Sequence, residues 1–206
     1  MHRFDWIGLT LKVNWANMTA HRGAFWSMAV LMCVQNLIYL SLWAVVFSRF
    51  SSLKGWGLSE VAFLYGSSAL GYGILFSVFG GLNQLSGTIQ SGLLDIFLAR
   101  PRPVLISVLM QRMRADSLGD ILAGIIVVAF FVQPSLSMLP LLFVLSTLAG
   151  LVFVSFRLIM HSLAFWGVGG ESAENGFIAF LIAATNPQNG FGAWGKFVLL
   201  TIFPAC

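Results

Sequence analysis

Three residues near the end of the sequence have side chains that could support acid–base or metal chemistry: His161, Glu171 and Glu174. Zinc hydrolases usually place such ligands in a doublet such as H-E-x-x-H, and serine hydrolases place their nucleophile in a G-x-S-x-G elbow. The sequence contains neither pattern. A membrane-embedded enzyme is therefore the weaker alternative, and we predict no catalytic site, metal or cofactor.

The sequence also lacks the P-loop motif for nucleotide binding. A P-loop needs G-x-x-x-x-G-K-[ST] to hold phosphates and magnesium, and no glycine in the sequence begins that pattern. Any ATP hydrolysis that this chain uses must come from a partner chain.

The most polar interior stretch covers residues 87–116. Residues 87–99 are predicted to form a short amphipathic helix or a re-entrant turn, and Pro101 and Pro103 should then fix an extended exit. Asp95 and Arg100 are five residues apart, which is not ideal helical pairing, although a turn could bring them together. The alternative is that the arginines here and at 112 and 114 contact lipid phosphate, an interpretation we favour for Arg112 and Arg114.

The elements that must position this segment are membrane helices. Hydrophobic residues make up 58% of the 206 positions and charged residues only 9%, against roughly 45–50% and about 25% in soluble domains. The chain is therefore predicted to be all-α, a single polytopic helical bundle over residues 1–206. Cys33 and Cys206 lie in or beside apolar runs and are interpreted as inert thiols rather than a disulfide.

A spanning helix needs about 20 mostly apolar residues. Runs of this kind cover residues 24–47, 61–82 and 136–156, whereas the third run in chain order, 118–132, is marginal by itself and needs residues 115–133 to span. The second run is rich in small residues, and Gly66 and Gly73 lie on roughly one face, which favours close packing against another helix. A fifth span is expected near the C-terminus, where residues 174–185 and 194–206 are either two parts of one interrupted crossing or the start of a span cut short. We favour the truncated span, with six spans in a full-length protein.

Polar residues within these runs are the candidates for intramembrane contacts. Gln35 and Asn36 interrupt the first span, and hydrogen bonding between helices is favoured for them over substrate contact. Arg157 is expected to extend to the lipid headgroups, with an ion pair to Glu171 or Glu174 as the alternative.

Residues 1–23 mix basic and apolar residues at helical spacing and contain no continuous apolar core of a signal peptide. They are predicted to form an amphipathic helix at the membrane surface, a loosely ordered tail being the alternative. The positive-inside rule places the N-terminus in the cytoplasm. In that orientation the inner segments hold eight Lys and Arg residues and the first outer loop holds two, with Lys196 unassigned.

Residues 92–101, Gly-Leu-Leu-Asp-Ile-Phe-Leu-Ala-Arg-Pro, resemble the G-x-L-D-x-x-L-x-R-P motif of ABC-2-type transporter permeases. The branch in question comprises bacterial exporter permeases, in which this motif occupies the cytoplasmic connection between the second and third spans. The resemblance extends over most of the chain. Members more often have Tyr-Pro where this sequence has Asn186-Pro187, so the last 30 or so residues match least well.

The resemblance implies a permease subunit in the cell membrane, driven by a separate ABC ATPase and paired with a second copy or a related permease. It implies an ATPase-coupling loop over residues 87–103. Its motif positions are Gly92, Leu94, Asp95, Leu98, Arg100 and Pro101. Within this loop Asp95 and Arg100 would fix the turn by polar contacts and Pro101 would stiffen it. Lipid is the surrounding partner, nucleic acid is not expected, and a non-transporting scaffold is the main alternative. The sequence does not identify the substrate.

Overall fold

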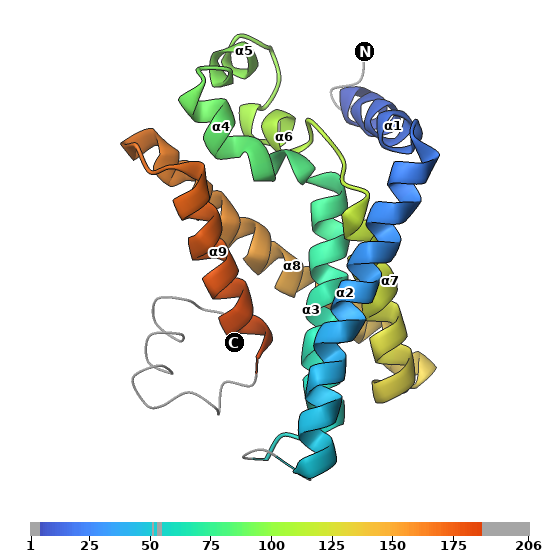
Figure 1. Ribbon diagram of the computed structural model, residues 1–206. Coiled ribbons are helices and arrows are strands. Elements are labelled where there is room, and N and C mark those ends of the chain that lie inside the picture. Colours follow the sequence, from blue (N-terminus) through green and yellow to red (C-terminus); the bar gives the residue numbers. More distant parts are fainter. Residues whose placement is uncertain (1–4, 51, 53–54, 187–206) are drawn as a thin grey trace.

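The computed structural model describes residues 5–50, 52 and 55–186, and Figure 1 shows their arrangement as helices joined by turns. The α-helices are α1 Asp5–Thr19, α2 Arg22–Arg49, α3 Leu58–Val78, α4 Leu85–Gln90, α5 Leu94–Leu98, α6 Val104–Leu109, α7 Asp116–Val127, α8 Leu139–Ser162 and α9 Gly170–Thr185. The predicted all-α fold is confirmed.

Three helical segments among the described residues are long and apolar enough to cross a membrane: Arg22–Arg49, Leu58–Val78 and Leu136–Trp166. They correspond to the first, second and fourth predicted runs. The third run forms α7, which continues into a π-helical turn over Val128–Val132. This segment is shorter than the three candidate spans, as its marginal apolar length indicated.

The centre of the bundle is α3, which packs against α7 on one side and α8 on the other, while α2 packs mainly against α7. The small residues of α3 make this possible. A Cβ atom on Gly66 would meet Val128 and Val127 at 2.9 and 3.1 Å, and one on Gly73 would lie 2.7 Å from the Ser117 carbonyl oxygen. The predicted close packing at Gly66 and Gly73 is confirmed, and α7 is the helix they contact.

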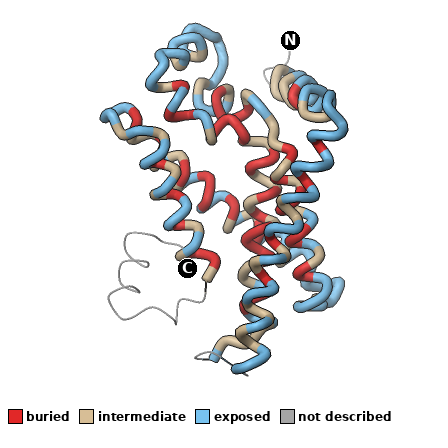
Figure 2. The backbone as a smooth tube through the Cα atoms, in the orientation of Figure 1, coloured by how far each residue is buried: buried red, intermediate tan, exposed pale blue. Residues whose placement is uncertain are grey.

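The outward faces are strongly apolar. In Figure 2 burial concentrates on α3 and the segments facing it, whereas α2 and much of α8 are exposed. Leu31, Leu42 and Val45 on α2 are each 60% exposed or more. Soluble proteins rarely leave such large apolar patches in water, so these faces suit lipid or another membrane helix.

Four short elements gather at one end of the bundle. In Figure 1 α1, α4, α5 and α6 lie at the end where the chain begins, whereas α2 ends and α3 begins at the opposite end. The predicted helix near the N-terminus is therefore present as α1; its location at a membrane surface stays a prediction. The apolar run 194–206 and Cys206 lie outside the described residues, and Cys33 is a free thiol.

Candidate functional site

The loop motif folds as two short helices rather than one. Helix α4 ends at Gln90, and α5 begins at Leu94 after a turn at Gly92, whose φ is +74°. This left-handed conformation suits glycine because it has no Cβ. The turn is held by hydrogen bonds from the Gly92 amide to the Ile89 carbonyl, 3.1 Å, and from the Asp95 amide to the Gly92 carbonyl, 3.2 Å. The segment predicted to form a short amphipathic helix or a re-entrant turn therefore contains both features, two short helices joined by a turn at Gly92.

Helix α5 has an inner and an outer side. Leu94 and Phe97 pack against the bundle core, while Leu93, Ile96 and Leu98 are 51%, 49% and 60% exposed. No residue of α5 is buried. An apolar surface therefore stands at the end of the molecule, carried on a helix whose other side is anchored.

The polar motif residues do not contact each other as expected. Asp95, Arg100 and Pro101 are all exposed, and the side-chain hydrogen bonds and ion pairs of the described residues include no Asp95–Arg100 pair. Instead, the Arg100 guanidinium lies over the Phe97 ring, 5.3 Å from its centroid. Polar fixation of the turn by Asp95 and Arg100 is therefore not seen; the backbone bonds around Gly92 hold it.

Helix α1 is tied to the far side of this loop. The Asn14 side chain is buried and donates a 2.6 Å hydrogen bond to the Met110 carbonyl, just beyond α6. The Arg102 guanidinium lies 5.3 Å from the centroid of the Trp6 indole. Sequence reasoning missed both contacts; an asparagine within an otherwise apolar helix face was the available signal.

One basic residue near α7 is held by protein rather than lipid. Arg114 forms an ion pair with Asp116, and its Nε donates to Asp116 Oδ1 at 2.9 Å. Burial alone would lower the pKa of Arg114, but the hydrogen bond to Asp116 and its charge raise that pKa above the ordinary value. Arg114 therefore has a protein partner, and contact of Arg112 and Arg114 with lipid phosphate stays a prediction.

Arg157 does not reach toward headgroups. Its side chain is only 4% exposed, and it forms an ion pair with Glu174 on α9. Its Nη1 also donates to the Tyr72 hydroxyl at 3.1 Å, and its guanidinium lies 4.6 Å from the Phe177 ring centroid. Extension to the membrane surface is wrong, and the alternative pairing with Glu174 is confirmed.

A histidine connects this buried pair to the loop. His161 Nε2 lies 3.2 Å from Glu174 Oε2, and Nδ1 lies 2.8 Å from Ser86 Oγ on α4. The order Ser86, His161, Glu174 resembles that of a hydrolytic triad. However, Ser86 is 2% exposed, its hydroxyl also contacts the His161 carbonyl, and Glu174 is engaged by Arg157. These contacts link α4 to α8 and α9.

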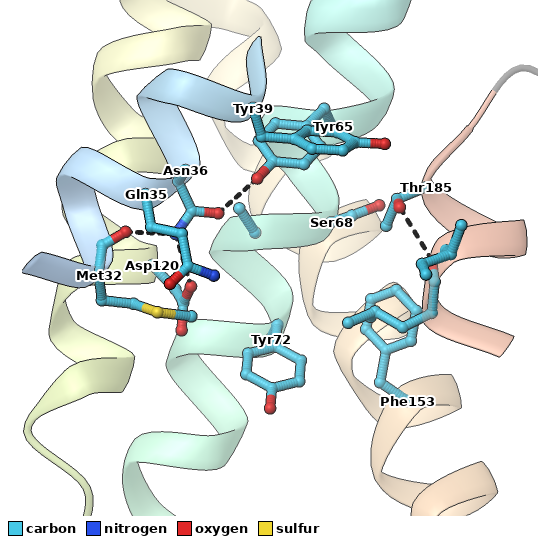
Figure 3. Close-up of a pocket in the computed structure, with 13 residues that line it drawn as sticks. Met32, Gln35, Asn36, Tyr39, Tyr65, Ser68, Tyr72, Asp120, Phe153 and Thr185 are labelled. Carbon is cyan, nitrogen blue, oxygen red and sulfur yellow. Dashed lines mark hydrogen bonds between the residues drawn. The ribbon is translucent and has the colours of Figure 1, made fainter. Parts of the chain in front are cut away.

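A second polar cluster lies in the middle of the bundle (Figure 3). Asn36 Nδ2 donates to Asp120 Oδ1 at 2.8 Å and to the Met32 carbonyl at 2.9 Å, and the Tyr65 hydroxyl donates to Asn36 Oδ1 at 2.5 Å. Interhelical hydrogen bonding, the favoured interpretation of Asn36, is confirmed. Gln35 lies beside it and lines a cavity of about 290 Å³ between α2, α3, α7, α8 and α9.

Asp120 is the functional candidate that sequence reasoning missed. It is an acid within the third apolar run, and an ionisable residue in such a run is a signal for function. Its side chain is buried, at 4% exposure, and lines the same cavity.

Comparison with known proteins identifies the family. A family model described as "ABC-2 family transporter protein" matches residues 28–206, which covers every candidate span except the first turns of α2. Searches of curated proteins and of solved structures found no match. Since the match extends over most of the sequence and agrees with the apolar helices described above, the chain belongs to the ABC-2 family of membrane transporter proteins and is a permease.

Proposed function

We propose that this chain is the transmembrane permease subunit of an exporter driven by a separate ABC ATPase. The observation that carries this proposal is the outer side of α5, where Leu93, Ile96 and Leu98 are exposed at the end of the bundle that also carries α1. A partner protein can bury such an apolar surface. Family membership favours an ATPase as that partner.

The proposed coupling path starts at the loop and enters the bundle through polar contacts. Movement of α4 would act on α8 through the Ser86–His161 hydrogen bond and on α9 through the His161–Glu174 contact. Movement of the chain after α6 would act on α1 through the Asn14 bond to Met110. Small displacements at a contact surface can be amplified when packed helices shift as units.

The remaining parts of the proposal concern sidedness and assembly. The permease would lie in the plasma membrane. Its N-terminus and the loop would face the cytoplasm, where the ATPase would bind. A homodimer or a second related permease would complete the path. The exposed apolar faces of α2 and α8 offer surfaces for packing against another permease, and lipid would cover what remains exposed. Export rather than import follows from the family resemblance.

The test uses the tagged full-length permease purified from gently solubilised native membranes, with identification of co-purifying chains and an ATPase assay. The double variant Ile96→Glu, Leu98→Glu places charges on the outer side of α5 without touching its packed side. It should lose at least about 80% of the co-purified ATPase, while the monodisperse elution of the permease itself is unchanged. The control is Leu136→Glu, which alters an 85% exposed leucine on the connection between α7 and α8.

Replacement of Asp95 and Arg100 by Ala separates a role of the loop in folding from a role in contacting the ATPase. Both side chains are exposed, and the ion pairs of the described residues include none between them. The variant should therefore fold normally and reduce ATPase binding or stimulation. Absence of any co-purifying ATPase with the wild-type chain would contradict the proposal and favour the scaffold alternative.

A further inference from the structure

The cavity lined by Gln35 and Asn36 contains a carboxylate oxygen with no hydrogen-bond partner. Asp120 Oδ1 accepts from Asn36, but Asp120 Oδ2 is buried and has no partner among the described residues. Asn36 lies near the middle of α2, so the carboxyl group sits deep within the bundle. A buried charge without a partner is costly, and such groups are usually paired or bind an ion.

The hydrogen bonds around Asp120 orient its carboxyl group, and an oxygen that accepts from an amide can do so in either protonation state. The Tyr65 hydroxyl donates to the Asn36 carbonyl oxygen, which turns the Asn36 amide nitrogen toward Asp120. The two residues thus present a donor to Asp120 Oδ1 and leave Oδ2 available for a positive group.

No basic side chain of the lining supplies that positive group. Among the residues that the structure describes, the thirteen that line the cavity include no Lys, Arg or His, and Asp120 is their single carboxylate. Arg114, which lies near the start of α7, is held by Asp116. Arg157 is held by Glu174.

The rest of the lining is aromatic and aliphatic. Tyr39 and Tyr65 stack with ring centroids 5.0 Å apart, and Tyr72 and Phe153 form another part of the wall (Figure 3). Aromatic faces attract cations through their quadrupole and also bury apolar groups. The volume of about 290 Å³ is at the small end for ligand pockets, roughly 300 Å³ and above, so the ligand must be small.

We propose that this cavity binds a small hydrophobic organic cation, with its ammonium group against Asp120 and its apolar body against the tyrosine rings. This inference rests on the proposed function, because it names the substrate class that the permease would carry. Gln35 and Asn36 then belong to the binding site, Gln35 as a lining residue and Asn36 as the residue that positions Asp120.

The test measures binding to the purified full-length permease in maltoside detergent, without an ATPase. The probe is radiolabelled benzyltrimethylammonium in equilibrium dialysis, and the competitor is neopentylbenzene, which has the same shape and no charge. Saturable binding that neopentylbenzene does not displace is expected. Asp120→Asn keeps the size and an oxygen that can accept from Asn36, and it should weaken binding at least tenfold. The control Glu171→Gln removes one negative charge from an exposed site and should not change binding.

A second measurement covers the case in which Asp120→Asn does not fold. Ser68 lines the cavity, so a Cys33→Ser, Ser68→Cys, Cys206→Ser variant places the only thiol of the chain there while Asp120 is retained. Benzyltrimethylammonium should slow alkylation of that thiol, and neopentylbenzene should not. A quaternary ammonium could also come from a choline lipid, so competition by dihexanoylphosphatidylcholine would identify the headgroup as the source.

The inference is overturned if the probe does not bind saturably, if Asp120→Asn binds it as well as the wild type, or if the neutral compound competes equally. The ATPase experiment is independent of these outcomes. Failed binding with a co-purifying ATPase would remove the substrate class and leave the permease subunit assignment in place. Saturable binding of the probe to a permease with which no ATPase co-purifies would support the cation site and contradict the proposed ATP-driven function.

Discussion

Two buried ionisable side chains in this bundle are accommodated in different ways. Arg157 has an ion pair, a tyrosine hydroxyl and an aromatic face around its guanidinium. Asp120 has one amide donor on Oδ1 and no partner on Oδ2 among the described residues. Since removing a charge from water is costly unless it is compensated, the Arg157 cluster is suited to stability and the Asp120 cavity to binding.

The Arg157–Glu174 pair should respond unequally to removal of its two members. Glu174→Gln leaves a guanidinium that is only 4% exposed, whereas Arg157→Met leaves a carboxylate that is 36% exposed. Uncompensated charge is worse when it is buried, and methionine fills the space of the arginine stem. We expect Glu174→Gln to destabilise by about 2–4 kcal/mol and Arg157→Met by about half as much, measured by thermal unfolding in detergent.

The double variant Arg157→Met, Glu174→Gln supplies the control for that comparison. It leaves no unpaired charge in the cluster, so its melting temperature should lie above that of Glu174→Gln alone. An equal or larger loss from Arg157→Met would show that packing on the phenylalanine rings outweighs the ion pair.

At the residue scale, the sequence could predict that a side chain needs a partner, but not which distant residue supplies it. Asn36 was predictable as an interhelical hydrogen-bonding residue because a polar group inside an apolar run needs a partner. Its partner Asp120 is 84 residues away, and local patterns carry no information on which helices meet. The predicted contact between Asp95 and Arg100 is not seen although the two residues are close in sequence. Nearness in sequence does not ensure contact when the chain turns at Gly92.

At the scale of elements, apolar length and small residues were sufficient for most of the bundle. The runs at 24–47, 61–82 and 136–156 became α2, α3 and α8, and Gly66 and Gly73 pack as expected. The crossing of α3 with α8 was not predicted, although it depends on the same kind of residue. Gly71 and Gly150 allow contact between two helix backbones, but a sequence alone does not show which glycines face each other.

This crossing should be intolerant of even one methyl group. A Cβ atom on Gly71 would lie 1.9 Å from the Ser146 carbonyl oxygen, and one on Gly150 would lie 2.3 Å from the Gly71 carbonyl oxygen. Backbone atoms cannot move aside as a flexible side chain can, so Gly71→Ala must separate α3 from α8. We expect a loss of about 3 kcal/mol or more, seen as a lower melting temperature or loss of monodisperse protein.

Gly8→Ala is the matched control for that substitution. Gly8 lies within α1, and a Cβ atom added there would meet no other atom within 4 Å among the described residues. Alanine favours helix over glycine by up to about 1 kcal/mol, so this variant should be neutral or slightly more stable. A Gly71→Ala protein as stable as Gly8→Ala would contradict the packing argument.

At the scale of the whole molecule, the two ends of the bundle differ in a way that fits opposite membrane faces. One end carries α1, α4, α5 and α6 together with Arg102, Arg112 and Arg114, and the connection between α7 and α8 lies toward the other end. The positive-inside rule assigns the basic end to the cytoplasm, and an ATPase can bind only there.

That sidedness is testable with two isosteric substitutions in a chain whose native cysteines are replaced by serine. Ser91 is exposed between α4 and α5, and Ser137 is exposed before α8. A membrane-impermeant maleimide should label Ser137→Cys in cells with an intact plasma membrane, and Ser91→Cys only after permeabilisation. Labelling of Ser91→Cys alone in intact cells would invert the orientation and remove the α5 surface from any cytoplasmic ATPase. Equal labelling of both would mean that the two ends do not lie on opposite sides of the membrane. The expected result would place the apolar surface of α5 where ATP is available, with the Asp120 cavity between that surface and the opposite membrane face.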